Sequence, residues 1–218
     1  MEEAVERIYR SVLSYDVEQV KARVTEALAS GLDPIRIMEE GLTRAIVEIG
    51  DRFGREEIFL VELMLAAKCC QQGMDLAKRV LAASQVQMLE PKGVIVIGTV
   101  KGDIHNIGKD IVRTLLEPAG FAVHDSGVDQ PPESFVQRAQ EVSARIVASS
   151  ALLTTTCPFQ KEIETKLREA GVRERVRTII GGAATSASWA REVGCDFYAP
   201  TATEGVKIIR SFFAGGGR

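Results

Sequence analysis

The sequence predicts an α/β protein in which an N-terminal four-helix bundle precedes a five-stranded, parallel, doubly wound sheet. Residues 1–83 carry apolar side chains at steps of three and four, which is the period of an amphipathic helix. From Gly93 onward, short apolar runs alternate with longer helical patterns, as is typical of strand–helix units in a parallel sheet. The stretch SQVQMLEPK fits neither pattern, so we expect two domains, 1–87 and 88–218.

Local signals delimit the helices of the first half. Gly31 is an expected C-cap, Asp33 an expected N-cap, and Pro34 takes the first position of the next helix. Two shorter helices are predicted before them, near residues 2–13 and 17–29. The apolar faces of the two longer helices that follow consist of Ile35, Met38, Leu42, Ile46, Ile49 and Phe53, and of Phe59, Leu63, Ala66, Cys70, Met74 and Ala77. The short loops favour antiparallel packing.

Five apolar runs predict the strands of the second half. They read GVIVIGT, FAVHDSG, RIVASSA, VRTIIGG and DFYAP. Right-handed connections between parallel strands leave one crevice, outside the carboxyl ends of the strands. We therefore expect a ligand there, enclosed by the loops after the first, third, fourth and fifth strands.

Composition narrows the functional class. The net charge is −3, without a basic tail or stripe, so we expect no nucleic-acid partner. No apolar run approaches the roughly 20 residues of a membrane span, and the acidic N-terminus is unlike a secretory signal. The cysteines form no CxxC pair; they are Cys69, Cys70, Cys157 and Cys195. We interpret them as reduced packing residues and expect a cytoplasmic protein with no membrane partner.

The loop after the first strand, GTVKGDIHNIGKD, contains the most informative residues. It lacks the glycine spacing of a phosphate-binding loop. A neutral imidazole at His105 can bind a transition metal, and the carboxylate of Asp103 can fix its tautomer. One histidine cannot hold bare zinc, and no second ligand lies at metal-binding spacing. A metal would therefore arrive within a macrocycle, either haem or corrin, although the CxxCH motif of c-type haem is absent.

Two later loops add weaker signals. Ser150 and the run Thr154–Thr156 can bond a ligand or a carboxylate, or can cap the helix near Pro158. Gly181 and Gly182 allow close approach of a ligand to the backbone, or form an ordinary turn.

Taken together, these motifs resemble the signature of cobalamin-binding domains. The matching residues are Asp103-x-His105-x-x-Gly108, Ser150-x-Leu152 and Gly181-Gly182. DRFGREEIFLVELMLAAK, at 51–68, is similar to the helical cap that precedes this domain in methyltransferase corrinoid proteins. The chain most resembles the corrinoid proteins of methylamine, methanol and methoxy-aromatic methyltransferases, and also the cap and cobalamin domains of methionine synthase. The resemblance implies a flavodoxin-like, cobalamin-binding domain behind a helical cap.

The resemblance also implies the site. His105 would be the lower ligand of cobalt in a cobamide whose own base is displaced into a slot beside the sheet. Asp103 would hydrogen-bond His105, and Ser150 would hydrogen-bond Asp103. The expected cofactor-binding residues are Asp103, Ile104, His105, Asn106, Ile107, Gly108, Ser150, Leu152, Thr154, Gly181 and Gly182, with Phe59, Leu63 and Met64 of the cap above the ring. We expect His124 to have no role and Trp189 to pack a helix.

The implied function is that of a methyl carrier with no catalytic residue of its own. A substrate:corrinoid methyltransferase would methylate cobalt(I), and a second methyltransferase would pass the methyl group to a thiol or tetrahydropterin. A reductive activation protein would be a third partner. Three alternatives remain: a cobalamin-dependent sensor, the small subunit of an adenosylcobalamin mutase, which normally lacks the cap, and a cofactor-free, response-regulator-like domain with Asp103 as phosphoacceptor.

Overall fold

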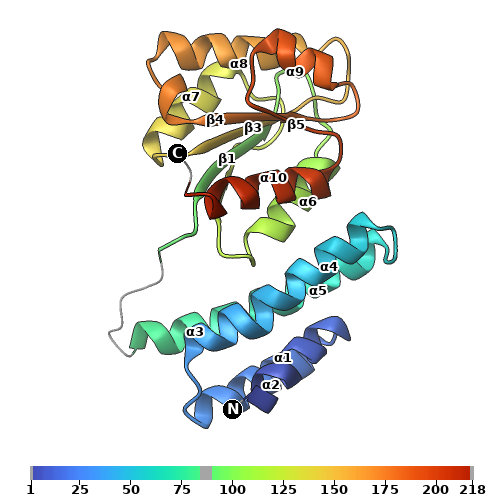
Figure 1. The fold of residues 1–218 in the computed structure, drawn as a ribbon, viewed down its shortest axis with the longest axis vertical. Helices are drawn as coiled ribbons and strands as arrows, with labels where there is room; N and C mark the ends of the chain where they lie inside the picture. The colour runs from blue at the N-terminus through green and yellow to red at the C-terminus, as the bar shows by residue number, and fades with distance from the viewer. Residues whose placement is uncertain (1, 84–89, 217–218) are drawn as a thin grey trace. The chain divides into compact units, whose positions relative to one another are not determined.

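The computed structural model describes residues 2–83 and 90–216, which fold into a helical unit and a sheet unit (Figure 1). The helical unit comprises Met1–Glu90 with Glu117–Gly120, and the sheet unit comprises Pro91–Leu116 with Phe121–Arg218. The boundary expected between residues 87 and 88 lies outside the described residues.

The helical unit is the four-helix bundle that the sequence predicts. Its helices are α1 (Glu2–Leu13), α2 (Val17–Ala29), a continuous helix made of α3 (Pro34–Arg36), the π-helical η1 (Ile37–Thr43) and α4 (Arg44–Gly54), and α5 (Leu60–Ala83). The predicted N-cap Asp33 accepts a hydrogen bond from the main-chain nitrogen of Ile35 at 2.9 Å. Pro34 is the first residue of α3, as predicted. None of the described helices is long and apolar enough to cross a membrane.

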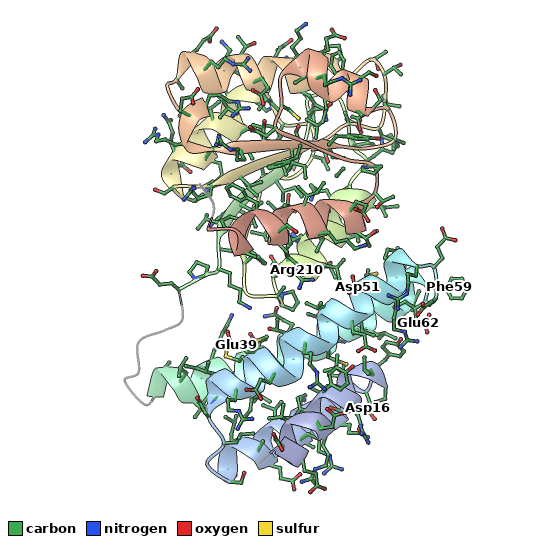
Figure 2. The ribbon with its side chains drawn as sticks, viewed as in Figure 1. Asp16, Glu39, Asp51, Phe59, Glu62 and Arg210 are labelled. Carbon is green, nitrogen blue, oxygen red and sulfur yellow. The ribbon has the colours of Figure 1, made fainter. Side chains whose placement is uncertain are left out.

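The bundle core follows most of the predicted apolar faces. Leu42, Ile46, Ile49 and Leu63 are fully buried. Phe59, in contrast, is 81% exposed, because α5 begins at Leu60 and Phe59 precedes the helical stripe. Figure 2 shows Phe59 and Glu62 together at the start of α5, where the Glu62 carboxylate accepts a hydrogen bond from the Phe59 main-chain nitrogen at 2.7 Å.

The sheet unit alternates strands and helices. Its elements are β1 (Val94–Thr99), α6 (Ile107–Leu116), β2 (Ala122–Asp125), α7 (Pro132–Glu141), β3 (Ile146–Ser150), α8 (Pro158–Glu169), the short 3-10 helix η2 (Arg173–Arg175), β4 (Arg177–Gly181), α9 (Ala187–Val193), β5 (Phe197–Ala199) and α10 (Ala202–Ala214). All neighbouring strands pair in parallel, in the order β2-β1-β3-β4-β5. This is the flavodoxin-like order, so the predicted fold class is confirmed.

Helices cover both faces of the sheet. Figure 1 shows α7, α8 and α9 on one face and α6 and α10 on the other. A buried cluster around Val96, Phe135, Val147 and Leu167 packs the first face. The strand order reverses between β1 and β3, which opens a crevice at their carboxyl ends.

Strand register brings distant sequence positions together at this edge. Thr99 of β1 lies opposite Ser150 of β3, Ser150 lies opposite Gly181 of β4, and Gly181 lies opposite Ala199 of β5. Ser150 and Gly181, which the sequence singles out at the ends of two strands, therefore lie side by side in one row.

Candidate functional site

The loop after β1 holds His105 against a buried carboxylate. The side chain of Asp103 is 0% exposed, whereas that of His105 is 49% exposed. One carboxylate oxygen of Asp103, Oδ1, lies 2.8 Å from His105 Nδ1 and accepts a hydrogen bond from the His105 main-chain nitrogen at 3.0 Å. Asp favours this local turn because its side chain reaches the backbone two residues on. With Nδ1 occupied, Nε2 is the ring nitrogen left to bind a metal.

The second oxygen of Asp103, Oδ2, is held by the loop after β3. It accepts hydrogen bonds from the main-chain nitrogens of Leu152 at 2.7 Å and Leu153 at 3.4 Å, and from the hydroxyl of Thr156 at 3.0 Å. The expectation that Ser150 supplies this hydroxyl is therefore wrong. The chain turns after Ser150, and the buried side chain that this turn directs at Asp103 belongs to Thr156.

These hydrogen bonds decide the charge of Asp103. Burial alone would raise the pKa of its carboxyl group. The main-chain nitrogens of His105 and Leu152, the imidazole and the Thr156 hydroxyl outweigh burial and hold this pKa at about 2. Asp103 is thus ionised at neutral pH and can only accept, so Nδ1 is the nitrogen of His105 that donates to it, and Nε2 is the one left to bind a metal.

Further contacts fix the backbone of this loop. The buried hydroxyl of Thr99 donates to the His105 carbonyl oxygen at 3.0 Å. Asp129 accepts from the Gly102 main-chain nitrogen at 2.6 Å and donates its own main-chain nitrogen to the Asp103 carbonyl oxygen at 2.9 Å. No motif in the sequence singles out Thr99; the signal for Asp129 is its place in the turn DQPP after the second strand.

A cavity of about 530 Å³ opens beside this loop, between the sheet and helices α6 and α10. Most of the predicted residues line it, namely Ile104, His105, Asn106, Ile107, Gly108, Ser150, Leu152, Gly181 and Gly182. Thr154 does not line the cavity and is exposed. The cavity is also lined by residues that the sequence pattern does not predict, among them Ile97, Lys109, Val112, Ala148, Ile179, Ala199, Gly205 and Ile209.

Small residues create this cavity. A Cβ at Gly182, where φ is +108°, would lie 2.1 Å from the Ala151 carbonyl oxygen, so only glycine fits. A Cβ at Gly205 would lie 3.3 Å from the Cβ of Ala199 and would begin to fill the slot. A Cβ at Gly108 would meet nothing within 4 Å, so the space beside His105 is open. The residues present therefore leave room for a bulky ligand.

One buried glutamine supports the cavity wall from behind. Gln160 donates to the carbonyl oxygens of Ser149 at 3.1 Å and Gly181 at 3.4 Å. Its own side-chain oxygen accepts from the indole nitrogen of Trp189 at 3.0 Å. Trp189 also packs against the core beneath α7 and α8, as expected of a packing residue.

Part of the surface around His105 is apolar. Its exposed large side chains are Ile104, Ile107, Leu152 and Leu153, of which Ile104 is 73% exposed. Exposed apolar groups around a nitrogen that is available to bind a metal suit a wide, mostly apolar macrocycle. Within residues 2–83 and 90–216, no group of three or more His, Cys, Asp or Glu side chains could hold a metal ion.

The cap residues expected to cover the ring do not share one environment. Met64 is 59% exposed and, like Phe59, is available for contact. Leu63 is fully buried in the bundle core, so its expected contact with a corrin is wrong for this conformation. The expected contacts of Phe59 and Met64 with a corrin remain predictions.

Comparison with known proteins agrees with the geometry. A family model described as B12 binding domain matches residues 93–207, and a second model with that description matches residues 4–78. Trimethylamine corrinoid protein 1 of Methanosarcina acetivorans is 40% identical over 210 residues, which cover 96% of this chain and 97% of the relative. Dimethylamine corrinoid protein 1 of the same organism is 40% identical over 213 residues, covering 98% and 99%.

Two solved structures are also similar. The methanol:cobalamin methyltransferase complex of Methanosarcina barkeri has a TM-score of 0.87 at 26% identity, over 98% of this chain and 80% of that chain. A cobalamin-binding protein of Desulfitobacterium hafniense has a TM-score of 0.77 at 28% identity, over 95% and 98%. The chain therefore belongs to the B12-binding corrinoid proteins of methyltransferase systems: it is a corrinoid methyl carrier, and its cofactor is a cobamide.

Proposed function

We propose that this chain carries methyl groups for a methylamine-specific methyltransferase, with His105 as the lower ligand of cobalt. The observation that carries the ligand assignment is the hydrogen bond between His105 Nδ1 and Asp103, which leaves Nε2 of this half-exposed ring to bind a metal at the mouth of the cavity. The relatives named for trimethylamine and dimethylamine support the choice of a methylamine as methyl donor.

The residues of the chain bind and orient rather than react. A bound cobamide would supply the metal centre that takes up a methyl group and gives it away. His105 would bind this metal centre, and the ionised Asp103 would raise the basicity of Nε2 and fix the ring orientation. Leu152 and Thr156 would keep Asp103 in place and charged. The cavity between the sheet and α10 would hold the nucleotide tail.

The remaining partners follow from the role of a carrier. We propose that a second methyltransferase passes the methyl group to a thiol or tetrahydropterin. We also propose that a reductive activation protein reduces cobalt again after it has been oxidised. We place these reactions in the cytoplasm; the free cysteines support this location. Methylation by a trimethylamine or dimethylamine methyltransferase, but not by a methanol methyltransferase, would support the proposed donor.

A phosphoacceptor role for Asp103 is not supported. Its carboxylate is fully buried and both oxygens already accept hydrogen bonds. The match of a second B12 binding model to residues 4–78 also favours a capped methyl carrier over a mutase subunit.

Replacement of His105 tests the ligand assignment. We expect His105→Ala, loaded with hydroxocobalamin, to lose the visible spectrum of the wild-type complex because its lower ligand changes. The control is His124→Ala, which removes the other histidine, on the edge strand β2, and should leave the spectrum as it is. An unchanged spectrum in His105→Ala would refute the assignment.

A further inference from the structure

The cavity changes character along its length. Its mouth, at the carboxyl edge of the sheet, carries the polar side chains of His105, Asn106, Ser150 and Thr201. Its inner end lies one strand repeat behind that edge and about one or two helical turns inside α6 and α10. The side chains there are all aliphatic, namely those of Ile97, Val112, Ala148, Ile179 and Ile209.

The charge nearest the inner end is already neutralised. Lys109 is buried, and its ammonium lies 2.5 Å from an Asp125 carboxylate oxygen and 2.8 Å from an Asp110 carboxylate oxygen. Asp125 also pairs with Arg113 at 3.0 Å. The Lys109 ammonium is therefore already paired with carboxylates from β2 and α6, and it is a poor partner for a ligand.

The backbone of the inner end is occupied as well. Ile97 and Ala148 face each other across paired strands, and Ala148 in turn faces Ile179 of β4. In a parallel sheet, the main-chain donors and acceptors of such central strands bond to their neighbours. Within the described cavity wall, a heterocycle bound at the inner end would therefore contact apolar side chains and would find no free hydrogen-bonding group.

We propose that this inner end selects cobamides by their lower base, accepting an apolar benzimidazole and discriminating against a purine such as adenine. The proposal rests on the proposed function, because it requires the displaced base to occupy the cavity. The amino group and ring nitrogens of adenine would lose water there without gaining a partner. Burial of one such unpaired group weakens binding roughly 10- to 100-fold.

Three corrinoids test the selection directly. The dissociation constant of the apoprotein is measured by equilibrium dialysis for cobalamin, for its analogue with an adenine lower base, and for cobinamide, which has no base. We expect cobalamin to bind roughly 10- to 100-fold more tightly than the adenine analogue. Equal or tighter binding of the adenine analogue would overturn the proposal.

The same titrations separate the two claims. If all three corrinoids bind equally and each shows a spectral change that requires His105, the base selection is wrong while the ligand assignment holds. If no corrinoid shows a His105-dependent change, the proposed function itself fails.

Two variants probe the slot. Gly205→Val places side-chain atoms toward Ala199 and Val112, so we expect weaker cobalamin binding and unchanged cobinamide binding. The matched control is Ser211→Val, which adds the same side chain at an exposed position of the same helix and should change neither. Equal effects of Gly205→Val on both corrinoids would contradict the proposal.

Ile209→Asn keeps the proposal testable if Gly205→Val does not fold. It supplies a donor and an acceptor at the inner end, where Ile209 is now buried. We expect the preference for cobalamin over the adenine analogue to shrink. A preference as large as that of the wild type would count against selection by this wall.

Discussion

Two carboxylates are buried near opposite ends of the strands of the same sheet, and their charges are stabilised by different kinds of partner. Asp103, at the carboxyl edge, accepts hydrogen bonds from main-chain nitrogens, the Thr156 hydroxyl and the half-exposed ring of His105. Glu164, at the amino edge, pairs with Arg173 at 2.6 Å and with Arg168 at 3.0 Å, and it also accepts from the hydroxyl of Thr178.

Under the proposed function, this difference distinguishes a carboxylate that orients a metal ligand from one that only stabilises the fold. The arginines balance the charge of Glu164, and Arg173 continues to Asp196 at 2.8 Å, so this network closes on itself. Uncharged donors stabilise the charge of Asp103 but do not cancel it, which leaves the carboxylate free to polarise His105. A buried charge alone therefore does not indicate a binding site. What distinguishes the two carboxylates is whether charged or uncharged groups stabilise them.

The largest expected effect concerns Glu164. Glu164→Gln removes one of the two carboxylates that pair with Arg173, whose side chain is only 13% exposed. Loss of one partner of a buried ion pair costs about 3–5 kcal/mol of unfolding free energy. Urea unfolding of the apoprotein measures this loss. Wherever the variant is folded, it should bind cobamide like the wild type; weaker binding would erase the distinction between the two carboxylates.

Asp103→Asn is the matched change at the other edge. An amide cannot provide the charge that raises the basicity of His105, and it can donate to Nδ1, which favours the wrong tautomer. We expect cobamide affinity to fall roughly 10- to 100-fold, as for other residues that orient a metal ligand. Equilibrium dialysis of both variants compares them directly. Unchanged affinity in Asp103→Asn would mean that Asp103 has only a structural role.

A smaller effect distinguishes two hydroxyls beside Asp103. Thr156→Val removes one hydrogen bond to the carboxylate at nearly constant shape, which costs about 1–3 kcal/mol shared between folding and cofactor binding. Thr156→Ser retains the hydroxyl and should bind cobamide normally. Ser150→Ala should weaken cobamide binding less than Thr156→Val does. A larger effect of Ser150→Ala would favour the hydrogen bond from Ser150 to Asp103 that the sequence resemblance implies.

Much of this architecture could be predicted because the sequence encodes it locally. Alternation of apolar runs and helical patterns predicts the sheet, and parallel register then carries Ser150 and Gly181 to the edge that holds His105. The choice of Thr156 could not be predicted, since it depends on how the chain turns after β3. Ala148 and Gly205 were also missed, because small apolar residues shape a cavity without any chemical signature of their own.

The cap shows the same limit. A regular period groups Phe59 with Leu63, but a helix that starts at Leu60 leaves Phe59 exposed and Leu63 in the core. The π-helical turn of η1 also interrupts the regular period, and Ile37 is buried where the pattern predicts Ile35. Neither the first helical residue nor a wide turn is visible in apolar spacing.

The most direct test of the central claim is electron paramagnetic resonance of the cobalt(II) protein grown with histidine labelled by the spin-one-half isotope of nitrogen. His124→Gln serves as background, since it leaves His105 as the one labelled ring in the chain. If His105 is the lower ligand, labelling converts the triplet splitting from the axial nitrogen into a doublet. A triplet that persists after labelling would show that the cobamide keeps its own base on the metal and would contradict the account.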